Sequence, residues 1–257
     1  PPLEEQNQIV SYLDQKTQQI SNQIREIKTK IKLLNDSRNS LIEKVVSKGI
    51  NLNVEMKNSD VEWIGDIPSH WTTKKLKYLV QHVSEKKTPE EEDIKISPEY
   101  VESNTGVCRN LYSEHTGDGY KFQKGDILLN KLRIYLKKVL LVEYEGLSVG
   151  EMIVLRTDNT ILSKFIFNTL FSDRLIGYLN SLSTGVKVPR VSPENILSTK
   201  FPLPPLNEMD EINKFVDQKN QSFFETISIE EERIELLEKY KKSLISEVVT
   251  GKKRVVN

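Results

Sequence analysis

One helical segment occurs twice in this chain, and this internal repeat limits the possible folds more than any other feature. When the sequence is shifted by 203 positions, from Pro1 to Pro204, Pro-Pro-Leu falls on Pro-Pro-Leu without a gap. The Leu-Leu pair that begins at Leu33 then falls on the pair that begins at Leu236. A solenoid would repeat every 20–50 residues or so. The spacing instead predicts two copies of one element on either side of a different domain.

Each copy has the apolar spacing of a coiled coil, because apolar residues recur in alternating steps of four and three. The stretch from Leu13 to Val45 would form a helix about 50 Å long, at about 1.5 Å per residue. We predict that the two helices pair antiparallel, which requires the ends of the middle domain to lie close together. The predicted seam residues are Leu13, Ile20, Ile24, Ile27, Ile31, Leu34, Leu41, Val45, Val216, Phe223, Ile227, Ile234, Leu237, Leu244 and Val248.

The signals at the helix ends divide the chain into three parts. Gly49 and Gly251 lie where each helix is expected to stop, since glycine readily adopts the left-handed conformation that follows a helix. We therefore predict a coiled-coil helix in residues 1–50, a separate domain in residues 51–202 and a second coiled-coil helix in residues 203–257.

The middle part has both strand and helix patterns. Strands are predicted at residues 127–129, 139–142 and 152–155, which are short apolar runs. Helical spacing covers residues 161–182 with a new start at Ser172, while residues 72–83 fit either a strand or a short helix. The predicted fold class is α+β: a mixed α/β domain inserted between two long helices that pair as an antiparallel coiled coil.

Composition limits the cellular setting. The chain has 37 basic and 37 acidic residues, and no apolar run approaches the roughly 20 residues that span a bilayer. The single cysteine, Cys108, excludes an internal disulfide and favours a reducing compartment, so we expect a cytoplasmic protein. The first residue is Pro1 rather than Met, which indicates a fragment, a processed chain or a trimmed chain.

The motifs expected of an enzyme are missing from the sequence. There is no phosphate-binding GxxxxGK[ST] loop, and the three histidines do not have metal-ligand spacing. The triplet Asp93-Ile94-Lys95 is a weak nuclease signal, because such triplets are expected by chance in a chain this charged. We predict no enzymatic activity, no catalytic residue, no metal and no cofactor in this chain.

Several ordered motifs together resemble the specificity subunits of type I restriction–modification systems. The family's conserved helices begin like the Pro-Pro-Leu-Glu-Glu-Gln at Pro1, and its recognition domain begins like VEWIGDIPSHW at Val61. The run KGDILLNKLRIYL from Lys124 and the run STGVKVPRVS from Ser183 resemble a central strand and loop and a later loop of that domain. Family members usually have two recognition domains, whereas this chain has one, so it resembles a C-terminal half or a half-subunit.

The resemblance implies a division of labour among several chains. The recognition domain would read one half of a bipartite target in double-stranded DNA, and the paired helices would set the distance to the other half. Methyltransferase subunits would supply S-adenosylmethionine chemistry, and motor–nuclease subunits would use ATP and Mg²⁺. The missing partner domain would come from a second copy of the chain or from an N-terminal recognition domain.

The candidate DNA-binding residues lie in two polar, basic loops. Residues 121–138 contain six basic side chains and one acidic side chain, Asp126. Lysine and arginine neutralise phosphates, and arginine also reads guanine edges. Without the resemblance, a solvated hairpin face would be the preferred interpretation of the first loop, and an ordinary connector would fit the second loop equally well. The candidates are Lys131, Arg133, Tyr135, Lys137, Lys138, Ser183, Thr184, Gly185, Lys187 and Arg190.

Two other functional classes stay open from the sequence. The first is a non-catalytic coiled-coil scaffold whose middle domain binds protein. The second is a nuclease or methyltransferase with a degenerate site. Salt-dependent binding to a particular duplex sequence distinguishes DNA recognition from the scaffold, and activity of the purified chain alone would indicate the enzyme.

Overall fold

The computed structural model describes residues 1–255, which form two compact units. The first unit contains Pro1–Arg38 and Gln218–Asn257, and the second contains Asn39–Asp217. The sequence places its boundaries at 50/51 and 202/203, where the long helices end and begin. The compact units divide within the helices, 12 residues before the end predicted for the first helix and 15 residues after the start predicted for the second. The reason is that Val46, Ile212 and neighbouring helical residues belong to the core of the second unit.

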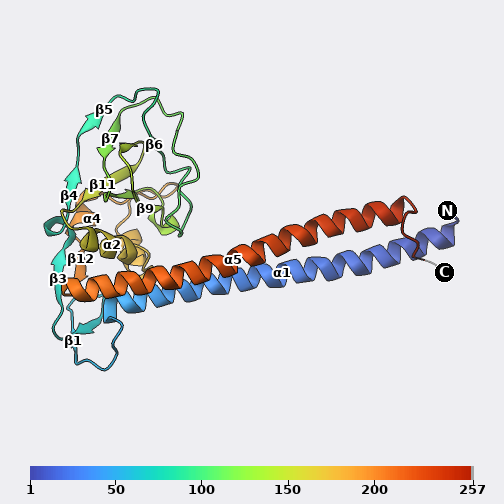
Figure 1. Ribbon diagram of the computed structural model, residues 1–257, viewed down its shortest axis with the longest axis horizontal. Coiled ribbons are helices and arrows are strands. Elements are labelled where there is room, and N and C mark those ends of the chain that lie inside the picture. The colour runs from blue at the N-terminus through green and yellow to red at the C-terminus, as the bar shows by residue number, and fades with distance from the viewer. Residues whose placement is uncertain (256–257) are drawn as a thin grey trace. The chain divides into compact units, whose positions relative to one another are not determined.

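The first unit is an antiparallel pair formed by the greater part of two long helices, α1 (Leu3–Lys48) and α5 (Leu206–Val249), which run side by side in Figure 1. Arg38 donates to Asn220 at 2.7 Å, Lys30 bonds to Glu230 at 2.5 Å, and Lys241 donates to Ser21 at 2.8 Å. The residue number rises along one helix as it falls along the other. The predicted antiparallel pairing is therefore confirmed.

Burial in the first unit follows the heptad pattern. Every predicted seam side chain in both helices is buried or half-buried, and Ile27 is only 5 % exposed. Leu33 and Ile229, which are apolar but lie outside the seam pattern, are 61 % and 65 % exposed. The spacing of the apolar residues, rather than their number, thus decides which side chains pack between the helices.

Polar residues also occupy the seam. The buried Arg38 guanidinium donates to Asn220 and lies 4.9 Å from the ring centre of Phe224. Burial lowers the pKa of Arg38 to about 10, so it stays charged at neutral pH. A buried polar residue in a coiled-coil seam favours the one register in which it finds its partner. Arg38 and Asn220 therefore help to specify how the two helices align.

We expect the Lys30–Glu230 pair to make the stability of the rod pH-dependent. The hydrogen bond from Lys30 lowers the pKa of Glu230 below its ordinary value of 4.5. A carboxyl group with a lowered pKa in the folded state stabilises that state above its unfolded pKa and loses this contribution as the pH falls through the folded pKa. Glu230→Gln should therefore lower the melting temperature at pH 7, and the difference from the parent should shrink below about pH 4.5. An equal difference at pH 7 and pH 3 would contradict this expectation.

The second unit contains four small sheets. Two are antiparallel pairs, β1 with β2 and β12 with β3, and two have four strands in the orders β5-β7-β10-β6 and β4-β11-β8-β9. The strands are β1 (Met56–Asn58), β2 (Asp66–Pro68), β3 (Thr72–Lys75), β4 (Gln81–Val83), β5 (Lys86–Lys87), β6 (Lys95–Ile96), β7 (Gly119–Phe122), β8 (Ile127–Asn130), β9 (Val139–Leu141), β10 (Gly146–Ser148), β11 (Met152–Arg156) and β12 (Lys200–Leu203).

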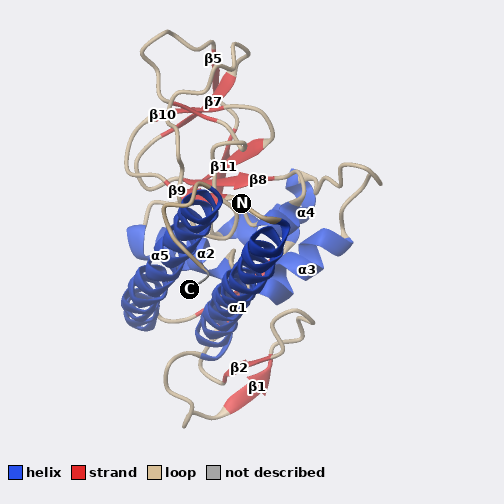
Figure 2. Cartoon of the chain, turned by 90° about the vertical axis from the view of Figure 1, so that its right-hand side faces the viewer, coloured by secondary structure: helices blue, strands red, loops and turns tan. Residues whose placement is uncertain are grey.

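The sheet β4-β11-β8-β9 lies in the middle of this unit and is buried on both faces. Successive side chains of a strand point to opposite faces. Leu128 and Val154 accordingly pack with the small sheet β5-β7-β10-β6, while Leu129 and Ile153 belong to the core that includes the helices. Figure 2 shows the sheet β5-β7-β10-β6, then the sheet β4-β11-β8-β9, then the short helices of this unit. Double burial explains why these strands are continuous apolar runs in the sequence.

Three short helices cover the other face: α2 (Thr160–Thr169), α3 (Asp173–Ser181) and α4 (Pro193–Ser198). The Ser172 side chain accepts from the Leu175 N–H and caps α3, so the helix predicted over residues 161–182 starts again where the sequence indicated. Ser192 caps α4 in the same way, with Pro193 in the first helical turn. Residues 72–83 include both predicted alternatives: strand β3, a 3₁₀ turn (Leu76–Tyr78) and strand β4.

Within the second unit, Trp63 anchors strand β12, which leads into α5, and Trp71 contacts the end of α1 and the start of α5. The Trp63 indole N–H donates to the Lys200 carbonyl at 3.1 Å. The buried Trp71 donates to Glu208 of α5 at 2.9 Å, and its ring lies so close to Gly49 that a Cβ there would be 3.2 Å away. Gly49 also has φ of +74°, which favours glycine, so it ends α1 as predicted.

Among the described residues 1–255, no helix is both long and apolar enough to cross a membrane.

Candidate nucleic-acid interface

The first candidate loop connects β8 to β9 and has an unusual backbone. A 3₁₀ turn (Ile134–Leu136) lies between Arg133 and Lys137, which have φ of 48° and 49°. Residues other than glycine in this left-handed region cost about 1–3 kcal/mol each and are maintained only by the surrounding structure. Here the buried Ile134 and the Asn130 side chain, which bonds both backbone groups of Leu132, maintain the loop. This backbone conformation fixes the positions from which the exposed Arg133 and Tyr135 side chains project into solvent.

The second candidate loop is a hairpin closed by Thr184 and Arg190. Their backbone N–H and C=O groups bond to each other in both directions at 2.9 Å. Gly185 has φ of +91°, which permits the turn, and Val186 at its tip is fully exposed. A closed hairpin with exposed side chains at its tip can approach another surface closely.

The two candidate loops are joined by backbone hydrogen bonds. The Arg133 N–H donates to the Pro189 carbonyl at 2.8 Å, and the Val191 N–H donates to the Lys131 carbonyl at 3.1 Å. Leu132 and Arg190 form a β-bridge between these bonds. Segments more than 50 positions apart in the sequence thus form one surface. We call this surface the basic platform; it comprises Lys131, Arg133, Tyr135, Thr184, Gly185, Lys187 and Arg190.

Most polar groups of the basic platform are open to solvent. Arg133, Thr184 and Lys187 are exposed, Tyr135 is 50 % exposed, and the Arg190 side chain is 53 % exposed. Exposed guanidinium and ammonium groups bind phosphates without first breaking a buried contact. The geometry of the basic platform therefore suits contact with a polyanion.

The prediction that Lys137 binds DNA is corrected, because its side chain points into the protein. Its side chain is only 6 % exposed, and its ammonium donates to the Phe171 carbonyl and to Asp173. Moving a buried, paired ammonium to a phosphate would first break these bonds. Lys137 therefore anchors the loop against the start of α3 and does not face outward.

Two other candidates are also less accessible than the sequence suggests. The Lys138 ammonium donates to the Pro98 carbonyl at 2.6 Å, and Lys138 lines a hollow together with Glu99 and Glu102. The Ser183 hydroxyl oxygen is buried and has no hydrogen-bond partner in the described part of the chain. Neither residue belongs to the outward-facing group of the basic platform.

The Glu151 carboxylate offsets part of the positive charge of the basic platform, and the nearby His82 adds none. Glu151 forms ion pairs with Lys131, at 3.3 Å, and with Arg190. Burial lowers the pKa of the nearby His82, and the positive charge of Lys131 lowers it further, while Glu194 acts in the opposite sense. His82 is therefore neutral at pH 7 and adds no positive charge.

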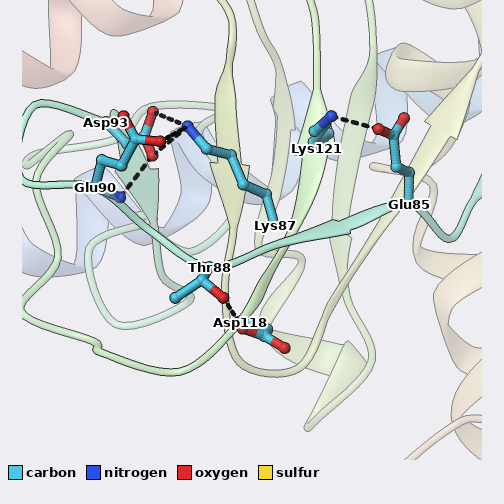
Figure 3. A network of polar contacts seen from close by, with 7 residues as sticks. All are labelled: Glu85, Lys87, Thr88, Glu90, Asp93, Asp118 and Lys121. Atoms are coloured by element: carbon cyan, nitrogen blue, oxygen red, sulfur yellow. Dashed lines mark hydrogen bonds and ion pairs between the residues drawn. The ribbon is translucent and has the colours of Figure 1, made fainter.

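The basic run seen in the sequence does not form one patch. Lys124 pairs with Glu143 at 3.0 Å, and Lys121 pairs with Glu85. Figure 3 shows Lys121 and the neighbouring Lys87, each directed at carboxylates rather than at solvent alone. Lys121 and Lys124 are thus neutralised by carboxylates. They take no part in the backbone hydrogen bonds that join the two candidate loops.

Residues 68–239 match the family model described as the type I restriction modification DNA specificity domain. The chain belongs to this family. It is 28 % identical over 288 residues to the type I restriction enzyme MjaVIII specificity subunit of Methanocaldococcus jannaschii, and the match covers 100 % of this chain and 62 % of that protein.

Solved structures share the fold of this specificity domain. A chain from a structure that describes complex assembly and conformational transition of the type I R-M system superposes with a TM-score of 0.61 at 14 % identity, covering 96 % of this chain and 60 % of that chain. The HsdS subunit from Thermoanaerobacter tengcongensis gives a TM-score of 0.53 at 14 % identity, covering 96 % and 58 %. The chain thus spans about three fifths of the length of the proteins it matches.

Sequence reasoning missed Glu151, which contacts both loops of the specificity domain. Gly150-Glu151 before an apolar run indicates a turn and a strand, and the structure has a turn there followed by β11. Nothing in the spacing connects Glu151 to Lys131 or Arg190, because ion pairs between distant segments depend on how the chain folds. The ion pairs of Glu151 with Lys131 and Arg190 exist only once the two loops are joined in the folded chain.

Proposed function

We propose that this specificity domain reads one half of a bipartite target in double-stranded DNA. The observation that carries the proposal is the junction of the two candidate loops, which places exposed Arg133, Thr184 and Lys187 on one surface. Phosphate contacts would position the duplex, and base-edge contacts by Arg133 and Arg190 would read its sequence. The family match supports a nucleic-acid partner, whose negative charge is opposite to that of these residues.

The long helices would serve as a spacer and a scaffold. Helices of 46 and 44 residues are about 65–70 Å long at about 1.5 Å per residue. A rod of this length exceeds the roughly 34–36 Å of one turn of B-DNA, which suits two half-sites more than one turn apart. Methyltransferase subunits and motor–nuclease subunits would assemble on it, and the other half-site would be read by a second copy of the chain or by a further recognition domain. We propose that the complex acts in the cytoplasm.

The chain itself would be non-catalytic. S-adenosylmethionine, ATP and Mg²⁺ would bind to the partner subunits. In residues 1–255, no group of three or more His, Cys, Asp or Glu side chains is placed to hold a metal. In the proposed division of labour, its residues contribute recognition and assembly, and the bond-making steps belong to the partners.

We expect Arg133→Asn to weaken DNA binding more than the loss of any other single charge on the basic platform. Asparagine tolerates the left-handed backbone of this position, so the loop should keep its shape. Loss of a good bidentate base contact costs about 1–3 kcal/mol, which corresponds to a five- to more than a hundredfold rise in Kd. Titration of the chain with a duplex enriched from a randomised pool measures this change.

Lys121→Ala is the matched control, because it removes one positive charge from the neutralised network of Figure 3. Its Kd should stay within about twofold of the parent, since paired exposed charges contribute little. Equal weakening by both substitutions would show that only net charge matters. Unchanged binding by Arg133→Asn would place the DNA surface elsewhere, for example in the loops of residues 84–118.

A further inference from the structure

Glu151 is an acidic residue that contacts both candidate loops of the basic platform, which is proposed to bind a polyanion. Its carboxylate contacts Lys131 through Oε2 and Arg190 through Oε1, so one side chain engages a cation from each loop. Its backbone carbonyl also accepts from the Lys131 N–H at 2.9 Å. A carboxylate repels phosphate, so its presence at this place needs a physical reason.

The three side chains differ in how far they are exposed to solvent. The Lys131 and Glu151 side chains are 18 % and 27 % exposed, whereas that of Arg190 is 53 % exposed. Arginine has five N–H donors, and the contact with Glu151 uses its Nη2. Arg190 thus keeps donors for a further partner while one end of its guanidinium is fixed.

We propose that Glu151 is a specificity-determining positioning residue, which restrains Lys131 and Arg190 so that they do not bind phosphates of any sequence. With Glu151 in place, the Arg190 guanidinium has a fixed orientation, and it contributes most binding free energy where a base edge matches that orientation. Without it, both cations are free to contact phosphates anywhere on the duplex. This inference rests on the proposed function, since it concerns how the same surface distinguishes sequences.

The test compares Glu151→Gln with the parent on two duplexes. One duplex is enriched by the parent chain from a randomised pool, and the other is a scrambled version of it. Glu151→Gln keeps the shape of the side chain and removes its charge. We expect binding to the scrambled duplex to tighten about tenfold at low salt, and the slope of log K against log[salt] to steepen by about 0.9, the effect of one more neutralised phosphate. Preference for the enriched duplex should fall at least fivefold.

Glu143→Gln is the matched control, because Glu143 pairs with the exposed Lys124 and the change in net charge is identical. If both substitutions shift binding equally, the effect is one of overall charge and the inference is wrong. Glu151→Asp keeps the charge but shortens the reach, so a loss of preference with this variant supports positioning even if Glu151→Gln folds poorly.

The route through Arg190 is tested by combining substitutions. In an Arg190→Ala chain, Glu151→Gln should change the preference between duplexes by a smaller factor than it does in the parent, because only Lys131 is left for Glu151 to restrain. A full effect in that background would overturn the inference. If the parent itself does not distinguish the two duplexes, the proposed function fails and this inference fails with it. If the parent distinguishes them and Glu151→Gln behaves like Glu143→Gln, only the inference fails.

Discussion

Ile27→Asp should destabilise the paired helices by about 3–5 kcal/mol, because it places an unpaired charge among apolar side chains. Ile27 is 5 % exposed in the seam of the first unit. An isolated long helix gains little stability by itself, so the rod depends on packing of its apolar stripe. Loss of helical circular dichroism during thermal unfolding measures the effect, and a melting temperature several degrees below that of the parent is expected.

Leu33→Asp gives a matched control on the same helix. The chemical change is again an aliphatic side chain to aspartate, but Leu33 is 61 % exposed and lies outside the seam. Its effect should stay within about 0.5 kcal/mol, as for most surface substitutions. If the two variants melt at the same temperature, the seam does not stabilise the rod, and the assignment of buried positions from the heptad is wrong.

Arg156→Ala should destabilise the second unit by about 3–5 kcal/mol, because it leaves a buried carboxylate without its cation. The Asp126 side chain is 1 % exposed. Its two oxygens accept from Arg156 Nε at 2.9 Å and from Nη2 at 2.6 Å, and one also accepts from the Gln123 N–H at 2.9 Å. Removal of Arg156 would leave only the backbone donor. Chemical denaturation of the chain should show a lower midpoint for the transition of this unit.

A double substitution separates the lost charge partner from lost packing. Asp126→Asn removes the buried charge and keeps an oxygen for the Gln123 N–H, so Asp126→Asn with Arg156→Ala should be less destabilised than the sum of the two single changes. Lys124→Ala is a control, since its partner Glu143 is exposed and such pairs contribute little. Simple additivity of the two changes would show that Asp126 and Arg156 do not stabilise the unit as a pair.

The sequence predicted the long helices and their antiparallel pairing because both depend on local periodicity and on a repeat. Alternating steps of four and three define a continuous apolar stripe, and Gly49 ends the helix by its own backbone preference. The apolar strands at β8 and β11 and the helix start at Ser172 were found for the same reason. Each of these signals involves residues within one or two turns of helix or within one strand.

The length of each compact unit could not be read in this way. The apolar stripe continues to Val45 without a change of spacing, yet Val45 packs into the core of the second unit. A stripe specifies that a face is buried but not which partner covers it. That choice depends on the tertiary packing of segments far apart in the chain.

The candidate site shows the same division. The sequence by itself determined two basic loops, because their lysine, arginine and glycine content can be read without knowing the fold. Only the tertiary structure decided that Arg133 bonds to Pro189, that Lys137 turns inward to Asp173, and that Glu151 engages both loops. Adjacent lysines such as Lys137 and Lys138 are chemically identical, so their roles differ only through the carbonyls and carboxylates that folding brings within reach.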